Sequence, residues 1–373
     1  MRLAAIVVSM AFASAASVLT AQRSSSAGEA AHRPLTRASG MAPALTSYLR
    51  QTIGLTPDEI RAEIAGRPVV RVLDPPDNRE IAVLGVIRIN VPRSFYIHRV
   101  SDFPSSLRDS TRMRFGVFSE PPTAADVATF SLPHADVEEL SRCDTHRCNV
   151  KLSTQEITQL RAAIRSNSPG ADSIASAYLR NVMLRYVSAY RVQGNAALVV
   201  YDDQRLASAA AHVMQAMLSR SPYLYPYAPS LERYLKNYPH DRPAGVHEAV
   251  FWSEDDLPGL KPTLSITHQI VVAPREVPTA TLIVSKQLYA DHYLDGALDL
   301  SAVVDMTRSL PADAEGIDLV MLRRWHFDDL PNGGLLNVRG KVKAKMRDQT
   351  LALLSSTKAS NEGAYVIRRG SQR

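Results

Sequence analysis

Hydrophobic and polar positions in the first third of the chain follow one strand pattern and two helix patterns. Nearly every position in the segment Glu80–Val91 is apolar, which predicts a strand buried on both faces. Ahead of it, Thr56, Pro57 and Glu59 form the pattern that begins a helix with a capping box. Behind it, Ser94–Phe103 predicts a short helix or turn. This part of the chain should therefore run from helix to strand to helix.

The middle of the chain carries the 3.6-residue period of amphipathic helices. A capping box formed by Ser153 and Glu156 begins the first of these helices. The longest, Ala171–Gln193, repeats apolar residues every three or four positions, and Gly194 follows it as a natural C-terminal stop. Two shorter helices follow, at 206–218 and 230–238. Together these patterns predict a helical region at about residues 150–240.

Alternation of apolar and polar residues returns in the last third of the chain. The strands are predicted at residues 249–253, 263–273, 281–293, 298–305 and 318–327. This succession is typical of an antiparallel meander. The chain then continues into an amphipathic helix, Leu335–Leu354, whose apolar stripe includes Val338, Val342 and Met346 and should face the sheet.

The order of these elements resembles the START-like superfamily, whose helix-grip fold wraps a curved antiparallel sheet around one long C-terminal helix. The resemblance is carried by the exit of the first long strand at Val91–Phe95, by the strands within Thr263–Phe327, and by the helix from Leu335. It implies an α+β fold, in which the helices at about 150–240 form a large insertion.

The resemblance also implies a cavity between the sheet and the final helix, where START-like proteins hold hydrophobic molecules. We expect a hydrophobic small molecule or a lipid as the ligand, and no cofactor. The residues expected to line the cavity are His268, Tyr289, His292, Tyr293, Trp325, Val338, Val342 and Met346. The superfamily has no shared catalytic residues, so none is assigned, and a carrier or sensor is favoured over an enzyme.

Two other functions stay open on the sequence. The first is a hydrolase or cyclase that uses a histidine and tyrosine cluster in the same cavity, for example His268 with Tyr289 or His292. Within one regular strand Asp291 and His292 point to opposite faces, which argues against an Asp–His pair there. The second is an envelope interaction module that uses the helical insertion and the tyrosine-rich segment 221–229.

Motif and charge patterns argue against several other classes. The sequence holds no Gly-x-Ser-x-Gly elbow, no glycine-rich phosphate loop and no dinucleotide fingerprint. His247 and Glu248 begin like a zinc-helix signature, but Phe251 stands where the second histidine is needed. The net charge is +6, but the basic residues are spread among acidic ones rather than collected in blocks. Nucleic acid is therefore not an expected partner. The basic face of the last helix could contact an anionic membrane surface. The sequence does not indicate the oligomeric state.

The N-terminal segment has the features of a cleavable signal peptide. Arg2 supplies the positive end, Leu3–Ala13 is an apolar run too short to cross a bilayer, and Ala15 or Ala21 offers a cleavage site. We therefore expect a periplasmic or secreted protein, with an uncleaved anchor as the alternative. The predicted organisation is a leader at 1–21, a disordered linker at 22–48, a START-like domain at 49–360 and a flexible tail at 361–373.

Cys143 and Cys148 are the two cysteines of the chain, and they lie in one short polar loop. In an oxidising compartment they should form a local disulfide. The alternative is a metal site that adds His146, but no second Cys or His pair lies nearby to complete four ligands, so no metal is expected. This loop and the Ser285–Tyr293 strand are also similar to uncharacterised exported bacterial proteins.

Overall fold

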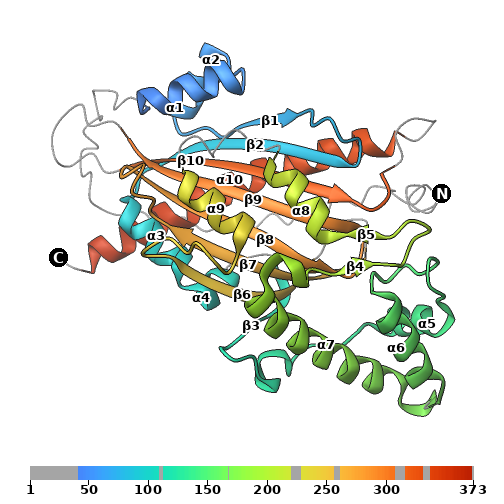
Figure 1. The fold of residues 1–373 in the computed structure, drawn as a ribbon. Coiled ribbons are helices and arrows are strands. Elements are labelled where there is room, and N and C mark those ends of the chain that lie inside the picture. Colours follow the sequence, from blue (N-terminus) through green and yellow to red (C-terminus); the bar gives the residue numbers. More distant parts are fainter. Residues whose placement is uncertain are drawn as a thin grey trace, which may run out of the picture.

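Eight strands form one antiparallel sheet in the computed structural model, which describes residues 41–108, 112–166, 168–219, 228–255, 261–306, 316–330 and 337–371. The strands are β1 Val69–Leu73, β2 Glu80–Ile89, β3 Arg112–Val117, β6 His247–Asp255, β7 Thr263–Val272, β8 Ala280–Ala290, β9 Leu294–Asp305 and β10 Ile317–Phe327. Their order across the sheet is β1, β2, β10, β9, β8, β7, β6, β3 (Figure 1). The last five strands pair in chain order, which confirms the predicted meander, and β2 lies beside β10.

The long helix α10, Val338–Gly370, packs on one face of the sheet, over β1 and β2. Its close approach requires Gly85 in β2, because a Cβ atom at this position would lie 2.7 Å from Leu354 and 2.9 Å from Thr350. Helix and sheet together bury apolar residues in two clusters on this face. The α+β fold expected from the sequence, with an antiparallel sheet packed on a long C-terminal helix, is therefore confirmed.

A second group of helices covers the opposite face of the sheet. These helices are α5 His134–Arg142, α6 Thr154–Ser166, α7 Ala171–Gln193, α8 Ala210–Ser219 and α9 Pro229–Asn237. Figure 1 shows α8 and α9 across the sheet on the side away from α10, with α5, α6 and α7 toward one end. Their buried residues join residues of the sheet in the largest apolar cluster. The sheet is therefore the middle layer between α10 and the helical insertion.

Shorter elements complete the described chain. They are α1 Pro43–Ser47, η2 Tyr48–Thr52, α2 Pro57–Ile64, α3 Arg93–Ser101, α4 Phe103–Arg108, η3 Ala124–Val127, η4 Ser168–Gly170, η5 Gly194–Ala197, β4 Val200–Tyr201 and β5 Ser208–Ala209. The helices α3 and α4 follow β2 where the sequence predicted a short helix or turn. The sequence did not predict β3 or α5, whose apolar residues follow neither period over a sufficient length.

Local sequence signals set the helix ends. At the start of α2, the Thr56 hydroxyl accepts a hydrogen bond from the Glu59 backbone at 3.2 Å, and the Glu59 side chain accepts one from the Thr56 backbone at 2.8 Å. The same reciprocal box begins α6 at Ser153. Gly194 ends α7 with a φ of 60°, where a Cβ atom would collide with the carbonyl oxygen of Tyr238. All three predicted helix ends are confirmed.

Two helix boundaries differ from the expectation. Helix α8 begins at Ala210, later than predicted, because the residues just before it form β5 and pair with β4. Helix α10 continues past Leu354 and through the predicted flexible tail to Gly370. Its last turns have a partner that the local pattern did not reveal, since Tyr365 packs edge-on against Phe95 with 5.0 Å between ring centres.

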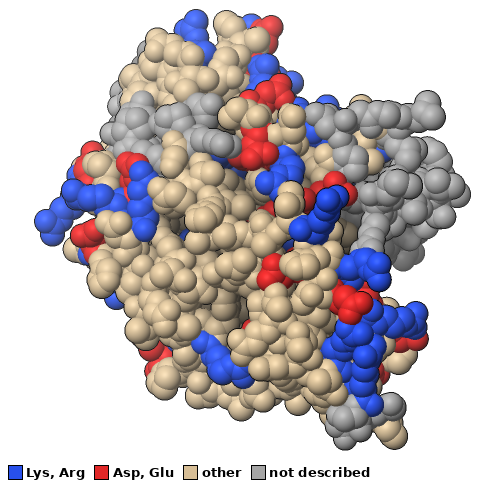
Figure 2. Space-filling view, turned by 45° about the vertical axis from the view of Figure 1, so that its right-hand side comes forward, with Lys and Arg blue, Asp and Glu red and all other residues tan. Residues whose placement is uncertain are grey.

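The described chain begins inside the predicted linker. Met41 and Tyr48 are buried in the largest apolar cluster, so this part of the linker belongs to the fold. The leader at 1–21 and the linker up to residue 40 lie outside the described residues. Within the described ranges, no helix is long and apolar enough to cross a bilayer. Figure 2 shows basic and acidic side chains interspersed on the face that it draws.

Cys143 and Cys148 form the predicted disulfide, with an S–S distance of 2.06 Å. The bond closes the loop between α5 and α6. Backbone N–H groups of His146 and Cys148 donate hydrogen bonds to the carbonyls of Asp202 and Asp203. The loop is therefore held both by the disulfide and by the segment that contains Asp202 and Asp203. Asn149 follows this loop directly.

Candidate functional site

The eight residues expected to line one cavity lie in three places. Four of them contribute to the apolar clusters between α10 and the sheet; these are Trp325, Val338, Val342 and Met346. His268 and Tyr289 lie on the opposite face, under the helical insertion. His292 and Tyr293 lie in the turn between β8 and β9, and Tyr293 packs against the α10 side from there. The sheet therefore separates His268 and Tyr289 from the other apolar members of the set.

A row of polar side chains crosses four neighbouring strands on the α10 face. Gln269, Ser285, Asp299 and Arg323 are successive cross-strand partners on β7, β8, β9 and β10, and all four are half-buried. Asp299 accepts hydrogen bonds from Arg323 Nε at 3.2 Å and from Trp325 Nε1 at 3.1 Å. The Arg323 guanidinium also lies 4.7 Å from the centre of the Trp325 ring. The row thus lies beside a positioned, partly exposed indole.

The next row along the same strands points to the helical insertion and is sealed from solvent. His268, Lys286, Leu298 and Arg324 are cross-strand partners in this row, and each is at most 3% exposed. On the other side, α10 rests on β1 and β2, at the edge of the sheet. Of these two rows of described residues, the one on the α10 side is therefore partly exposed and the one on the insertion side is buried.

His268 is the centre of a buried hydrogen-bond network. Its Nδ1 lies 2.9 Å from the hydroxyl of Tyr190 in α7, and its Nε2 lies 3.2 Å from Oε2 of Glu248 in β6. Tyr234 donates to the same Glu248 oxygen at 2.6 Å. Because burial lowers the pKa of His268, the neutral ring donates from Nε2 and accepts the Tyr190 hydroxyl at Nδ1. The network attaches α7 and α9 to the sheet and satisfies its own polar groups.

Lys286 extends this network without a counter-charge. Its Nζ donates to the hydroxyl of Tyr190 at 3.2 Å and to the side-chain oxygen of Asn195. Among the described residues no carboxylate pairs with it, and the side chain is completely buried. Burial lowers the pKa of Lys286 to about 7.

Tyr289 is held by neighbours on the insertion side. Its hydroxyl donates to the backbone carbonyl of Lys151 at 2.9 Å. Its ring lies 6.3 Å from the ring of Tyr186 and 6.1 Å from that of Tyr201. These contacts explain its burial through packing with α7 and β4.

The turn between β8 and β9 brings Asp291 and His292 to Asp136 of α5. His292 Nε2 lies 3.4 Å from Oδ2 of Asp136 and 3.9 Å from Oδ2 of Asp291, and its Nδ1 is 2.9 Å from the carbonyl oxygen of Asn149. The three residues are at most 3% exposed. The expected opposite orientation of Asp291 and His292 does not hold, because β8 has ended and Tyr293, at a φ of 61°, turns the chain.

Lys261 completes this cluster. Its Nζ lies 2.7 Å from Oδ1 of Asp136 and 3.3 Å from Oε2 of Glu139. Burial raises the pKa of Asp291 to about 7. Burial also opposes a charge on Asp136, but His292 and Lys261 hold the pKa of Asp136 below its ordinary value. Burial likewise opposes a charge on His292, but the two aspartates raise the pKa of His292 to about 9. At neutral pH the cluster therefore holds a charged imidazolium beside a carboxylate.

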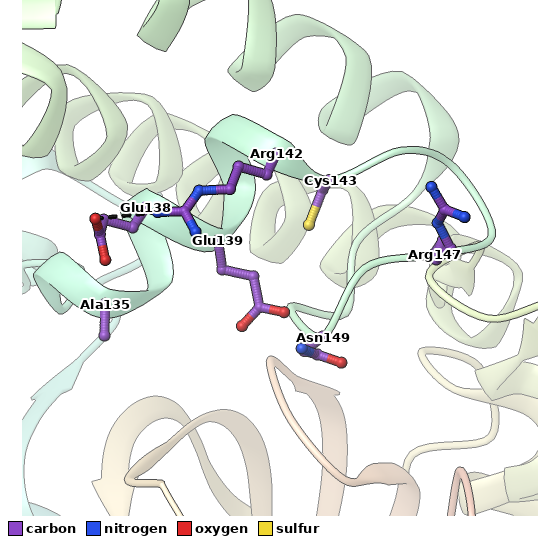
Figure 3. A pocket seen from close by; sticks show the side chains of 7 residues that line it. All are labelled: Ala135, Glu138, Glu139, Arg142, Cys143, Arg147 and Asn149. Carbon is purple, nitrogen blue, oxygen red and sulfur yellow. Dashed lines mark hydrogen bonds and ion pairs between the residues drawn. The ribbon is translucent and has the colours of Figure 1, made fainter. Parts of the chain in front are cut away.

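An open pocket of about 350 Å³ lies against the cluster (Figure 3). It is lined by Ala135, Glu138, Glu139 and Arg142 of α5, by Cys143 and Arg147 of the disulfide loop, and by Asn149. Two of these residues also contact the cluster, since Glu139 pairs with Lys261 and the Asn149 carbonyl binds His292. Figure 3 shows the Glu139 carboxylate and the Asn149 side chain near each other. The lining carries both signs of charge, so the pocket suits a polar molecule.

The structure contains a second buried cluster of charged residues, which the sequence did not predict. Lys151 Nζ lies 2.9 Å from Asp295, 3.5 Å from Asp328 and 3.7 Å from Asp203. It also lies 4.4 Å from the centre of the Tyr201 ring. Burial raises the pKa of Asp203 to about 6, despite the nearby lysine. These residues come from four distant segments, so no local spacing could have identified them.

Comparison with known proteins adds a distant structural similarity. No family model and no curated protein matches the chain. Among solved structures, the chain is similar to a START superfamily protein from Mycobacterium smegmatis, with 13% sequence identity and a TM-score of 0.23. The similarity covers 42% of this chain and 92% of that chain. The fold assignment therefore stands on the strand order and the position of α10.

Proposed function

We propose that the chain is an exported START-like protein that binds a hydrophobic small molecule or a lipid between α10 and the sheet. The observation that supports this most strongly is the half-buried row on the α10 face, from Gln269 to Arg323, which ends beside Trp325. A partly exposed face that combines polar side chains with an indole can contact both the polar and the apolar part of a small molecule.

The composition of this face indicates an amphipathic ligand. Trp325 of β10 and Val342 of α10 supply apolar surface. Ser285 and Gln269 supply neutral hydrogen-bonding groups, and Arg323 supplies a cation that is 12% exposed. A molecule with a hydrocarbon part on the indole and a polar end on the row would use both surfaces, which is the usual make-up of a small-molecule site.

The structure favours this binding role over a hydrolase or cyclase in the same place. The histidine and tyrosine considered for catalysis, His268 and Tyr289, lie on the insertion side, and their polar atoms are already paired. The envelope interaction module depends on the segment 221–229, most of which lies outside the described residues.

Native mass spectrometry of the full chain, purified from the periplasm of an expression host, tests the proposal. We expect a co-purified small molecule that is retained in the folded protein and released on unfolding. A ligand-free mass, together with no saturable binding of a dansyl-labelled fatty acid, would overturn it.

A matched pair of variants locates the binding site. Trp325→Ala removes the partly exposed indole and should weaken binding of the labelled fatty acid by about tenfold or more. Leu206→Ser removes an apolar side chain that is 83% exposed elsewhere on the surface and should leave binding unchanged. Equal loss in both variants would indicate non-specific adsorption.

A further inference from the structure

We propose that Asp136, Asp291 and His292 form a binding site for one divalent transition-metal ion, for which Zn²⁺ is the probe. One oxygen of each carboxylate and one imidazole nitrogen lie within 4.8 Å of one another. Zinc bonds to nitrogen and oxygen are about 2.0–2.2 Å long, so tetrahedral ligand atoms stand roughly 3.4 Å apart. The distance from His292 Nε2 to Asp136 Oδ2 is 3.4 Å, and that to Asp291 Oδ2 is 3.9 Å.

The imidazole is oriented as in a metal-ligating histidine. Because a carbonyl oxygen can only accept, His292 Nδ1 must donate its proton to Asn149. This leaves Nε2 directed at the two carboxylates, and an outer-shell bond of this kind fixes the ring orientation of metal-bound histidines. Asn149 follows Cys148 directly, so the disulfide loop holds the carbonyl that orients the ring.

Asp291 supplies an independent indication. Its Oδ1 accepts the backbone N–H of Leu264 at 2.9 Å. Its Oδ2 receives no hydrogen bond from any described residue, and its closest cation is His292 at 3.9 Å. A carboxylate charge on a residue that is only 3% exposed is costly unless a cation offsets it. A cation placed between Asp136 and Asp291 would offset this charge.

The surroundings leave room for such an ion to act. Lys261 binds Oδ1 of Asp136, whereas Oδ2 faces His292 Nε2. The imidazolium proton between Oδ2 and Nε2 leaves to solvent when the ion binds, so both atoms then become ligands. Three protein ligands leave one coordination position open on zinc, which is the arrangement of sites that bind water or a further ligand. The pocket in Figure 3 is lined by Asn149 and by Glu139, the partner of Lys261, so it lies next to the cluster. This proposal is independent of ligand binding on the α10 face.

Isothermal titration of the full chain, first dialysed against EDTA and then against metal-free buffer, tests the site with Zn²⁺. We expect one ion per chain, confirmed as a single zinc adduct by native mass spectrometry, and a rise in Tm. Asp291→Asn and His292→Gln should each weaken binding by about 100-fold or more, because each removes a ligand. Lys261→Met should strengthen binding, since it removes a positive charge beside the ion.

His134→Ala is the matched control, because His134 also lies on α5 near the cluster but is exposed and pairs with Asp172. It should bind zinc as the unmodified chain does. Absence of a zinc adduct and of a Tm change in the unmodified chain would overturn the proposal. Equal binding by the unmodified chain and by His292→Gln would also overturn it, since the ion would then lie elsewhere. If a ligand variant fails to fold, the response of Lys261→Met decides: unchanged or weaker binding contradicts the site.

Discussion

Trp325 of β10 donates its indole N–H to Oδ1 of Asp299 on β9, at 3.1 Å. Arg323 uses the other oxygen of the same carboxylate, at 3.2 Å, and its guanidinium lies over the indole. One carboxylate therefore fixes both an aromatic ring and a cation on the partly exposed α10 face. Side chains held in this way lose little freedom when a ligand binds, which is how a preorganised site gains affinity.

The first prediction concerns this carboxylate. Asp299→Ala should weaken binding of a dansyl-labelled fatty acid by about fivefold to tenfold, because Trp325 and Arg323 lose their common partner. The Tm should change little, since partly exposed ion pairs contribute at most about 1 kcal/mol. Asp348→Ala on the exposed side of α10 is the control and should bind normally. Unaltered affinity in Asp299→Ala would show that the pair does not shape the site.

The second prediction tests the grip of the sheet on α10. Gly85→Val should destabilise the protein by about 1–3 kcal/mol, because the new side chain collides with Leu354 and Thr350. Gly363→Ala, in an open part of the same helix, should instead stabilise it by about 0.5–1 kcal/mol. Urea unfolding measures both values. A stable Gly85→Val protein would mean that α10 does not approach the sheet so closely.

The third prediction follows from the unpaired charge of Lys286. Its pKa is about 7 in the folded protein and 10.5 ordinarily, so the unfolded chain binds more protons between these two pH values. The stability of the unmodified protein should therefore rise with pH across this window. Lys286→Met removes the group and should stabilise the protein by about 1–4 kcal/mol at pH 7, with a smaller gain at pH 9.5. A gain independent of pH, or a loss at pH 7, would contradict the low pKa.

The fourth prediction concerns the opposite case, a buried lysine that is paired. Lys151→Met leaves Asp295, Asp328 and Asp203 without their common cation and should cost about 3–5 kcal/mol in urea unfolding. Lys345→Met, on the exposed face of α10, is the control and should be close to neutral. A neutral Lys151→Met would show that the three carboxylates do not depend on this lysine.

The sequence predicts features that depend on neighbouring residues. The capping boxes at Thr56 and Ser153 and the stop at Gly194 act within one turn of helix, so their signals are local. The strands of the meander are long and strongly patterned, which is where periodicity is most informative. The end of α10 depends instead on Tyr365 meeting Phe95, a contact between distant segments, and the local pattern missed it.

The candidate sites were harder to predict because they depend on which layer covers which face. Alternation correctly placed His268 and Gln269 on opposite faces of the sheet. It could not tell whether α10 or the insertion covers the face that carries the histidine. Asp291 and His292 broke the alternation because a turn, not a strand, contains them. Asp136 joins them from another element, and no spacing connects it to them.

The most direct test of ligand binding on the α10 face uses the two tryptophans of the chain. Trp252 is completely buried on the insertion side, whereas Trp325 is partly exposed beside Asp299. Titration with a dansyl-labelled fatty acid should give saturable energy transfer from tryptophan to dansyl, and Trp325→Phe should remove most of that transfer. Saturable transfer that is unchanged in Trp325→Phe, or no saturable binding at all, would contradict a ligand between α10 and the sheet.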